Sequence, residues 1–122
     1  MVVGTKENAF YDWYVMVKGL SDYRAGKYQD AVHWLTVEFA SKPDSKPANE
    51  QLAFASAVIA MSYHRLEDPT NAKLELAKAK ALIDEKMPSI DHSDPNRKGP
   101  RSIDWLQAEL LTREARSLIE NH

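Results

Sequence analysis

The sequence predicts an all-α protein, and three observations support this prediction. Apolar residues recur at intervals of three and four residues in five separate segments, as on the buried faces of helices. Prolines and glycines separate these segments, and none of the segments alternates strictly as a strand does. Two of the segments also match each other at an offset of 41 residues. The 122 residues suit a single domain, which at this length can bury a core without disulfides.

The overall composition narrows the classes of function. Hydrophobic residues make up 43% of the chain and charged residues 28%, and the net charge is −2. Neither half has a basic excess, so nucleic-acid binding is not expected. The absence of cysteine rules out disulfides, thiolate zinc sites and cysteine nucleophiles. Without a signal-peptide pattern or a run of about 20 apolar residues, we expect a cytoplasmic chain that does not insert into a membrane, whether complete or part of a longer protein.

The first two helices are predicted over about residues 6–25 and 28–39, with a turn at Gly26 between them. The first helix carries apolar residues on several faces, so we expect neighbours to cover it on two sides. Its main stripe comprises Phe10, Trp13, Tyr14, Val17 and Leu20, and the stripe of the second comprises Tyr28, Ala31, Val32, Leu35 and Phe39. Because the turn is short, the two helices should be antiparallel neighbours.

The third and fourth helices are predicted over about residues 49–66 and 69–86. A polar loop with Pro43 and Pro47 precedes the third helix. Asp68 is expected to cap the fourth helix, with Pro69 in its first turn. The apolar side of the third helix comprises Leu52, Ala55, Ile59, Tyr63 and Leu66.

The last helix is predicted over about residues 102–121, after a proline-rich loop over residues 87–100. Ser102 is its expected cap. Its apolar side comprises Ile103, Leu106, Leu110, Leu111, Ala115 and Leu118. The single domain, residues 1–122, should therefore contain two antiparallel hairpins, about residues 6–39 and 49–87, and a C-terminal helix.

An internal repeat relates these helices. The segment GLSDYRAGKYQDAVHWL starts at Gly19, and its counterpart AMSYHRLEDPTNAKLEL starts at Ala60. The corresponding pairs include Leu20 and Met61, Ser21 and Ser62, Tyr23 and His64, Arg24 and Arg65, Gly26 and Glu67, Ala31 and Ala72, and Leu35 and Leu76. Part of the last helix also follows the repeat, because Ala108 and Arg113 have the same spacing as Gly19 and Arg24. Repetition of a helical hairpin is typical of a solenoid, where each unit buries a face on the next.

The first hairpin resembles the tetratricopeptide repeat (TPR), a helical hairpin of about 34 residues with small and aromatic residues in a set order. The matching residues are Gly19, Gly26, Tyr28 and Ala31. The second hairpin departs from the pattern, with Glu67 in place of the turn glycine and Pro69 in place of the aromatic. The loop at residues 41–49 accounts for the longer offset. The resemblance covers about residues 10–87 and implies a TPR-like α–α superhelix with residues 102–121 as a capping helix.

A second resemblance concerns the segments YRAGKYQDAVHWL, AMSYHRLEDPTNAKLELAKAKAL and DWLQAELLTREARSLI. Together they look like the helical repeat region of bacterial Ser/Thr protein kinases of the planctomycete type. This resemblance implies a module of a signalling protein. It does not imply kinase activity, because the chain has no glycine-rich loop and no HRD or DFG motif.

The TPR resemblance implies a groove for a protein or peptide partner on the inner face of the first and third helices. Such an apolar groove could hold an extended segment or a helix. The face carries Trp13, Met16, Leu20, Tyr23, Phe54, Ala57, Met61 and His64, with Arg24 and Arg65 at its polar edge. It lacks the lysine and asparagine set of chaperone-binding members, so that class of partner is not expected. Alternatively, the same residues form the core or a homodimer interface.

The arginines Arg24, Arg65 and Arg113 recur at one position of the repeat. On the inner face they could bind a carboxylate or a phosphate. Alternatively, each lies near a helix end, where a cation stabilises the helix dipole by about 0.3–1 kcal/mol and pairs with a nearby acid.

No motif in the sequence indicates catalysis, a metal or a cofactor. The histidines lack the spacing of a metal motif, and the loop with Asp91, His92 and Asp94 lacks the full calcium-binding pattern. No serine lies in a nucleophile elbow, and there is no phosphate-binding glycine loop. We therefore expect a non-catalytic scaffold or adaptor module. The alternatives are a homo-oligomerisation module of a larger bacterial signalling protein and a helical domain that binds or converts a small ligand.

Overall fold

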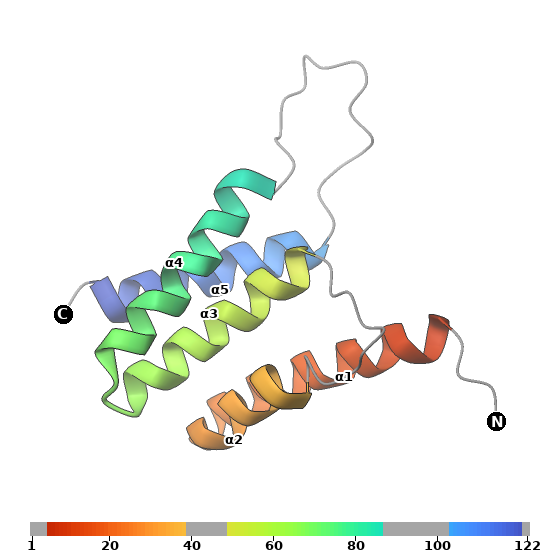
Figure 1. Ribbon diagram of the computed structural model, residues 1–122, viewed down its shortest axis with the longest axis horizontal. Coiled ribbons are helices and arrows are strands. Elements are labelled where there is room, and N and C mark those ends of the chain that lie inside the picture. The colour runs from red at the N-terminus through yellow and green to blue at the C-terminus, as the bar shows by residue number, and fades with distance from the viewer. Residues whose placement is uncertain (1–4, 39–48, 87–102, 121–122) are drawn as a thin grey trace, which may run out of the picture.

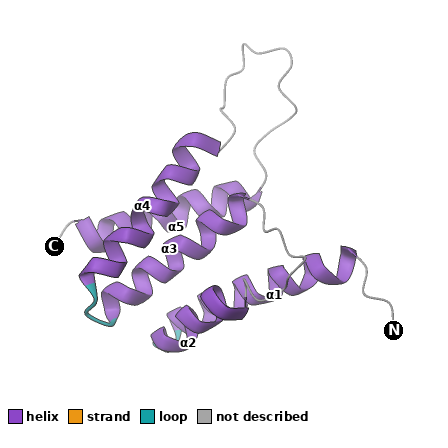
Figure 2. Ribbon diagram, viewed as in Figure 1, coloured by secondary structure: helices purple, strands orange, loops and turns teal. Residues whose placement is uncertain are grey.

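The computed structural model describes residues 5–38, 49–86 and 103–120, and every element in these ranges is helical (Figure 1, Figure 2). The elements are α1 (Thr5–Arg24), α2 (Tyr28–His33), a π-helical turn η1 (Trp34–Glu38), α3 (Asn49–Arg65), α4 (Pro69–Lys86) and α5 (Ile103–Glu120). The all-α prediction is confirmed, and each helix boundary lies close to its predicted position. The predicted loops around Pro43 and over residues 87–100, and the cap at Ser102, lie outside the described residues.

The helices contact one another in the order of a stack. α1 pairs with α2 and α3 pairs with α4, and α3 also packs against the α1–α2 hairpin. α5 packs against α3 and α4. The helices α1, α3 and α5 run in one direction and α2 and α4 in the other (Figure 1). Within the described ranges α1 and α5 have no backbone contact with each other, although both pack on α3.

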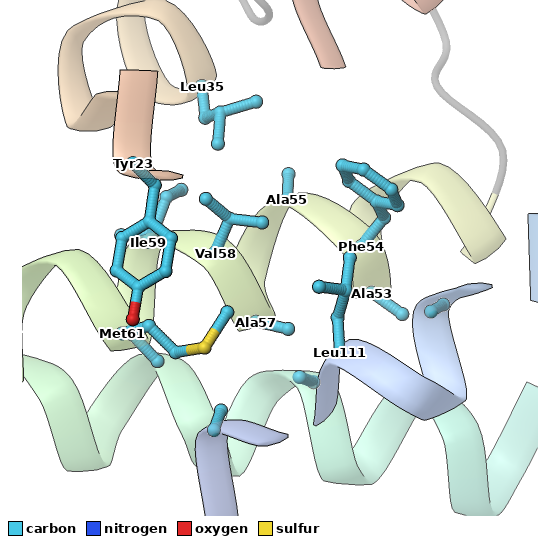
Figure 3. Close-up of a cluster of buried hydrophobic side chains, with 14 of the residues drawn as sticks. Tyr23, Leu35, Ala53, Phe54, Ala55, Ala57, Val58, Ile59, Met61 and Leu111 are labelled. Atoms are coloured by element: carbon cyan, nitrogen blue, oxygen red, sulfur yellow. The ribbon is translucent and has the colours of Figure 1, made fainter. Parts of the chain in front are cut away.

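Helix α3 lies at the centre of the core. Every residue from Ala53 to Ser62 is buried, because the α1–α2 hairpin covers one side of α3 while α4 and α5 cover the other. Figure 3 shows Val58 on the side of Leu35, and Ala57 on the side of Leu111 from α5. The helix that is covered on two sides is therefore the third, whose alanines allow this close packing.

Helix α1 is less covered than its sequence suggests. Neighbours cover α1 on two sides, where Val15 and Met16 are buried, but a further side remains open, since Tyr14 is 45% exposed and Val17 is 43% exposed. The reason is the position of α1 at the edge of the stack, where α2, η1 and α3 contact it.

Small residues allow the helices to approach closely at equivalent positions of the repeat. Gly19, Ala60 and Ala108, which come from α1, α3 and α5, are all buried. A Cβ atom on Gly19 would overlap the side chain of Leu35, which is itself buried in the core. The glycine in α1 therefore makes room for the leucine of the second helix of the hairpin.

The turn between α1 and α2 and the turn between α3 and α4 are closed by equivalent backbone hydrogen bonds. In each turn one residue adopts a left-handed backbone conformation, Gly26 with φ 83° and Glu67 with φ 62°. Two hydrogen bonds of a Schellman motif close each turn. They are Gly26 N–H to Tyr23 O (3.1 Å) and Lys27 N–H to Asp22 O (2.7 Å), and 41 residues later Glu67 N–H to His64 O (3.1 Å) and Asp68 N–H to Tyr63 O (2.9 Å). The two hairpins thus share their turn geometry as well as their sequence pattern.

Side-chain hydrogen bonds shape the start of α4 and the end of the second helix. The predicted cap is confirmed, because Asp68 Oδ1 accepts a bond from the backbone N–H of Asn71 (3.2 Å). The second helix was expected to be regular to residue 39, but it widens to a π-helical turn at Trp34. There the hydroxyl of Thr36 donates to the carbonyl of Val32 (2.6 Å).

The close approach at Gly19 predicts that Gly19→Ala destabilises the fold. Overpacking against Leu35 costs about 1–3 kcal/mol, while alanine gains about 1 kcal/mol of helix propensity over glycine. The net loss in the free energy of unfolding, measured by urea denaturation, should be about 1 kcal/mol. In a Leu35→Ala background the same change should be neutral or stabilising. Equal effects in both backgrounds would show that Gly19 does not make room for Leu35.

The left-handed residue in the second turn predicts that Glu67→Gly stabilises the protein. A non-glycine residue in this conformation costs about 1–2 kcal/mol, of which the greater freedom of glycine in the unfolded chain offsets a part. We expect the free energy of unfolding to rise by about 0.5–1 kcal/mol. Glu67→Ala is the control, since it removes the charge and keeps the strain, and it should have little effect. A gain with alanine as large as that with glycine would contradict the backbone explanation.

Candidate protein-binding groove

An open groove lies between α1, α3 and α5. Its volume is about 310 Å³. Because α1 and α5 both pack on α3 without a backbone contact between them, they form facing walls and α3 forms the floor. The lining is apolar except for one glutamine, and it comprises Met16, Val17, Leu20, Phe54, Gln107, Leu110 and Leu111.

The edges of the groove expose large apolar side chains on both walls. Val17 of α1 is 43% exposed, and Leu110 of α5 is 62% exposed. Leu106 lies one helical turn before Leu110 and is also exposed. Full burial of one such side chain contributes about 1.5–3 kcal/mol, so a partner that covers both edges gains a substantial part of that energy.

An ion pair joins the two walls at one end of the groove. The guanidinium of Arg24 donates two parallel hydrogen bonds to the carboxylate of Glu114, with N–O distances of 2.5 and 2.8 Å. Arg24 follows Leu20 by one turn on α1, and Glu114 follows Leu110 by one turn on α5. This bidentate pair therefore links α1 and α5, which both pack on α3 and have no backbone contact with each other.

A second arginine influences this ion pair. Hydrogen bonding with Tyr23 raises the pKa of Arg65 above its ordinary value, and the charge of Glu114 makes a smaller contribution in the same direction. The Arg24 guanidinium lies 5.6 Å from the centre of the Tyr23 ring. The hydrogen bonds from Arg24, together with the nearby charge of Arg65, lower the pKa of the Glu114 carboxyl below its ordinary value. We call Tyr23, Arg24, Arg65 and Glu114 the polar cluster, in which Arg24 binds Glu114 directly and Arg65 acts on it as a more distant charge.

The predicted site residues fall into three groups in the structure. Met16, Tyr23, Phe54, Ala57 and Met61 are buried in the core, Leu20 and His64 are half-buried, and Arg24 and Arg65 are exposed. The side chain of Trp13 lies outside the described residues, and only its place in α1 is known. Met16, Leu20 and Phe54 line the groove, whereas Met61 has no exposed surface for a partner.

The three repeated arginines have different surroundings. Arg24 pairs with Glu114 of another helix, and Arg113 pairs with Glu109 of its own helix at 3.6 Å. Pairing with an acid, one of the two alternatives for these residues, therefore describes both of them. Arg24 therefore binds Glu114, Arg113 binds Glu109, and Arg65 acts on Glu114 as a more distant charge.

The sequence prediction missed the wall that α5 contributes. Val17, Gln107, Leu110, Leu111 and Glu114 are absent from the predicted site but line the groove or its polar end. A signal was available, because the match of Ala108–Arg113 to Gly19–Arg24 places the last helix in the same series as α1 and α3.

Other classes of site find no support in the described ranges. No three His, Asp or Glu side chains of these ranges gather as metal ligands. The loop with Asp91, His92 and Asp94 lies outside them. None of the described helices combines the length and the apolar character needed to cross a bilayer.

Comparisons with known proteins do not assign a family. No protein-family model matches the chain, and no curated protein or solved structure matches it either. The functional argument therefore rests on the internal repeat, the groove and the polar cluster.

The polar cluster predicts a pH-dependent coupling between Arg24 and Glu114. Because both side chains are about half exposed, the pair should contribute about 0.5–1 kcal/mol. The pKa of Glu114 is lower in the folded state than in the unfolded chain, so this stability is present above the unfolded pKa and is lost as the pH falls through the folded one. A double-mutant cycle with Arg24→Gln and Glu114→Gln should show the coupling at about pH 7 and none at about pH 2.

The control for this cycle is the pair Arg113 and Glu109, which lies within one helix at a longer distance. Its coupling at neutral pH should be smaller, near the value of about 0.3–0.5 kcal/mol that is usual within a helix. A coupling for Arg24 and Glu114 that persists unchanged in acid would contradict the assignment of the interaction to the ionised carboxylate.

Proposed function

We propose that this chain is a non-catalytic protein–protein interaction module, a TPR-like stack of two hairpins and a capping helix that binds a partner segment in the groove. Three features support the TPR-like architecture. The two turns share their hydrogen bonds 41 residues apart, the helices contact one another in stack order, and small buried residues recur in α1, α3 and α5.

The apolar groove is the observation that carries the proposal. Its volume of about 310 Å³ is roughly twice the ~150 Å³ that accepts a benzene ring in an engineered cavity. Apolar side chains of a partner therefore fit between Val17 and Leu110. The described residues of the lining are apolar apart from Gln107, so this surface offers apolar contacts for binding.

The walls of the groove suit binding because they are preformed. Both walls are long helices anchored on the buried α3, and the Arg24–Glu114 pair spans them at one end. A partner therefore does not have to order the backbone of the host, and less of the binding energy is lost.

Self-association is the second candidate function. Leu106 and Leu110 lie one turn apart on the exposed side of α5 and could pair two copies of the chain. Light scattering separates the two candidates. A mass that stays monomeric over a wide range of concentration would contradict self-association. A dimer that Leu110→Glu converts to a monomer would support self-association over a separate partner.

The groove predicts that Leu110→Glu abolishes the binding of peptides selected by the protein. A display library of random 12-residue peptides, selected on the immobilised full chain, supplies the probes. We expect enriched peptides to carry apolar anchors and to lose about tenfold or more in affinity for the variant, because a charge replaces an apolar contact in a closed interface. Fluorescence polarisation measures the affinities.

The matched control is Leu74→Glu, since Leu74 is 54% exposed on α4 and does not line the groove. This variant should bind the peptides as the wild type does, and urea midpoints should show that both variants fold. Enriched peptides that bind Leu110→Glu as tightly as the wild type, or a selection that enriches none, would contradict the proposed function.

A further inference from the structure

We propose that the Arg24–Glu114 pair sets the spacing of the two groove walls and thereby limits the size of the apolar side chain that a partner inserts. The inference rests on the proposed function and adds the residues that determine its specificity. Neither residue is among the described lining of the groove. Both are therefore positioning residues, which act through the walls and not through contact with the partner.

The first step is the connection between the walls. Within the described ranges α1 and α5 both pack on α3 and have no backbone contact with each other. The guanidinium of Arg24 donates two hydrogen bonds to the carboxylate of Glu114 across this gap. A bidentate contact between two planar groups fixes their relative orientation as well as their distance. The pair therefore favours one spacing of the two helices, which a single flexible contact would not do.

The second step is the place of the pair relative to the groove. Leu20 of α1 and Leu110 of α5 both line the groove. Arg24 follows Leu20 by four residues, and Glu114 follows Leu110 by four residues. At 1.5 Å per residue, the pair lies about 6 Å along each helix axis from the lining. A change in the spacing of the helices at the pair therefore moves lining residues that are only one turn away.

The third step identifies the dimension of the groove that the pair controls. Phe54 and Leu111 belong to the lining and are also buried in the core, so the packing of the core fixes the depth of the groove. Val17 and Leu110 also belong to the lining but are exposed at its edges. The width between them follows the spacing of α1 and α5. This width determines whether a narrow aliphatic anchor or a wide aromatic anchor fits.

The fourth step is the size of the effect. Both side chains of the pair are about half exposed, so the pair favours the bound spacing only modestly. Loss of the pair lowers the affinity for a partner by the factor by which the population of that spacing falls. For an exposed ion pair this factor is about two to five. Residues that touched a charged partner directly could exceed this limit.

The test is a double-mutant cycle on peptide affinity with the full chain. The probes are 12-residue peptides selected on the wild type from a library without charged residues, so that direct charge contacts with the pair do not contribute. Arg24→Gln and Glu114→Gln should each lower the affinity about two- to fivefold. The double variant should bind no more weakly than the single variants, because each substitution removes the same interaction. Effects that add would show that each residue acts separately, and they would overturn the inference.

A second arm measures specificity. Selection on the double variant should enrich apolar anchors of a wider range of sizes than selection on the wild type, because its walls are not held at one spacing. The matched control combines Glu109→Gln and Arg113→Gln, a pair that lies within α5 and does not join the walls. This control should change neither the affinity nor the range of anchors. Urea midpoints should show that all the variants fold.

The outcomes also distinguish this inference from the proposed function. Peptides that require Leu110 but bind the Arg24 and Glu114 variants as tightly as the wild type, with the same range of anchors, would overturn the inference and leave the groove in place. A selection that enriches no peptide, or peptides that bind Leu110→Glu normally, would contradict the proposed function and the inference together.

Discussion

The structure depends on the packing of α3 against helices on both of its sides. Its alanines bring the neighbouring helices close, and Phe54, Val58 and Met61 fill the space between them. The buried hydroxyl of Ser62 donates to the carbonyl of Val58 (2.8 Å), so α3 buries this polar group without leaving it unsatisfied. Helices α1 and α5 both pack on α3 and have no backbone contact with each other. Helix α3 therefore completes the core and also separates the two walls of the groove.

The fold was largely predictable because its determinants are local. Helix boundaries followed from proline, glycine and capping residues, and the cap at Asp68 formed as expected. The repeat at an offset of 41 also identified Glu67 as the counterpart of Gly26, and the structure gives both residues a left-handed backbone. The π-helical turn at Trp34 was not predicted, because the periodicity of apolar residues does not encode a local widening of a helix.

The groove was harder to predict, because an apolar residue looks the same whether its own chain or a partner covers it. Met16 is 4% exposed and its neighbour Val17 is 43% exposed; Leu111 is 7% exposed and its neighbour Leu110 is 62% exposed. The two residues of each pair are successive in one helix, so their side chains point about 100° apart around the helix axis. Which of the two is exposed therefore depends on where the adjacent helices lie. The Arg24–Glu114 pair depends on the same positions, since 90 residues separate its partners.

The Arg24–Glu114 pair of the polar cluster links the two walls of the groove. An exposed ion pair contributes little to the free energy of unfolding, about 0.2–1 kcal/mol. Its larger effect is geometric, because a bidentate contact fixes the relative position of two helices that lack a backbone contact. The pair therefore matters more for the shape of the groove than for the stability of the fold.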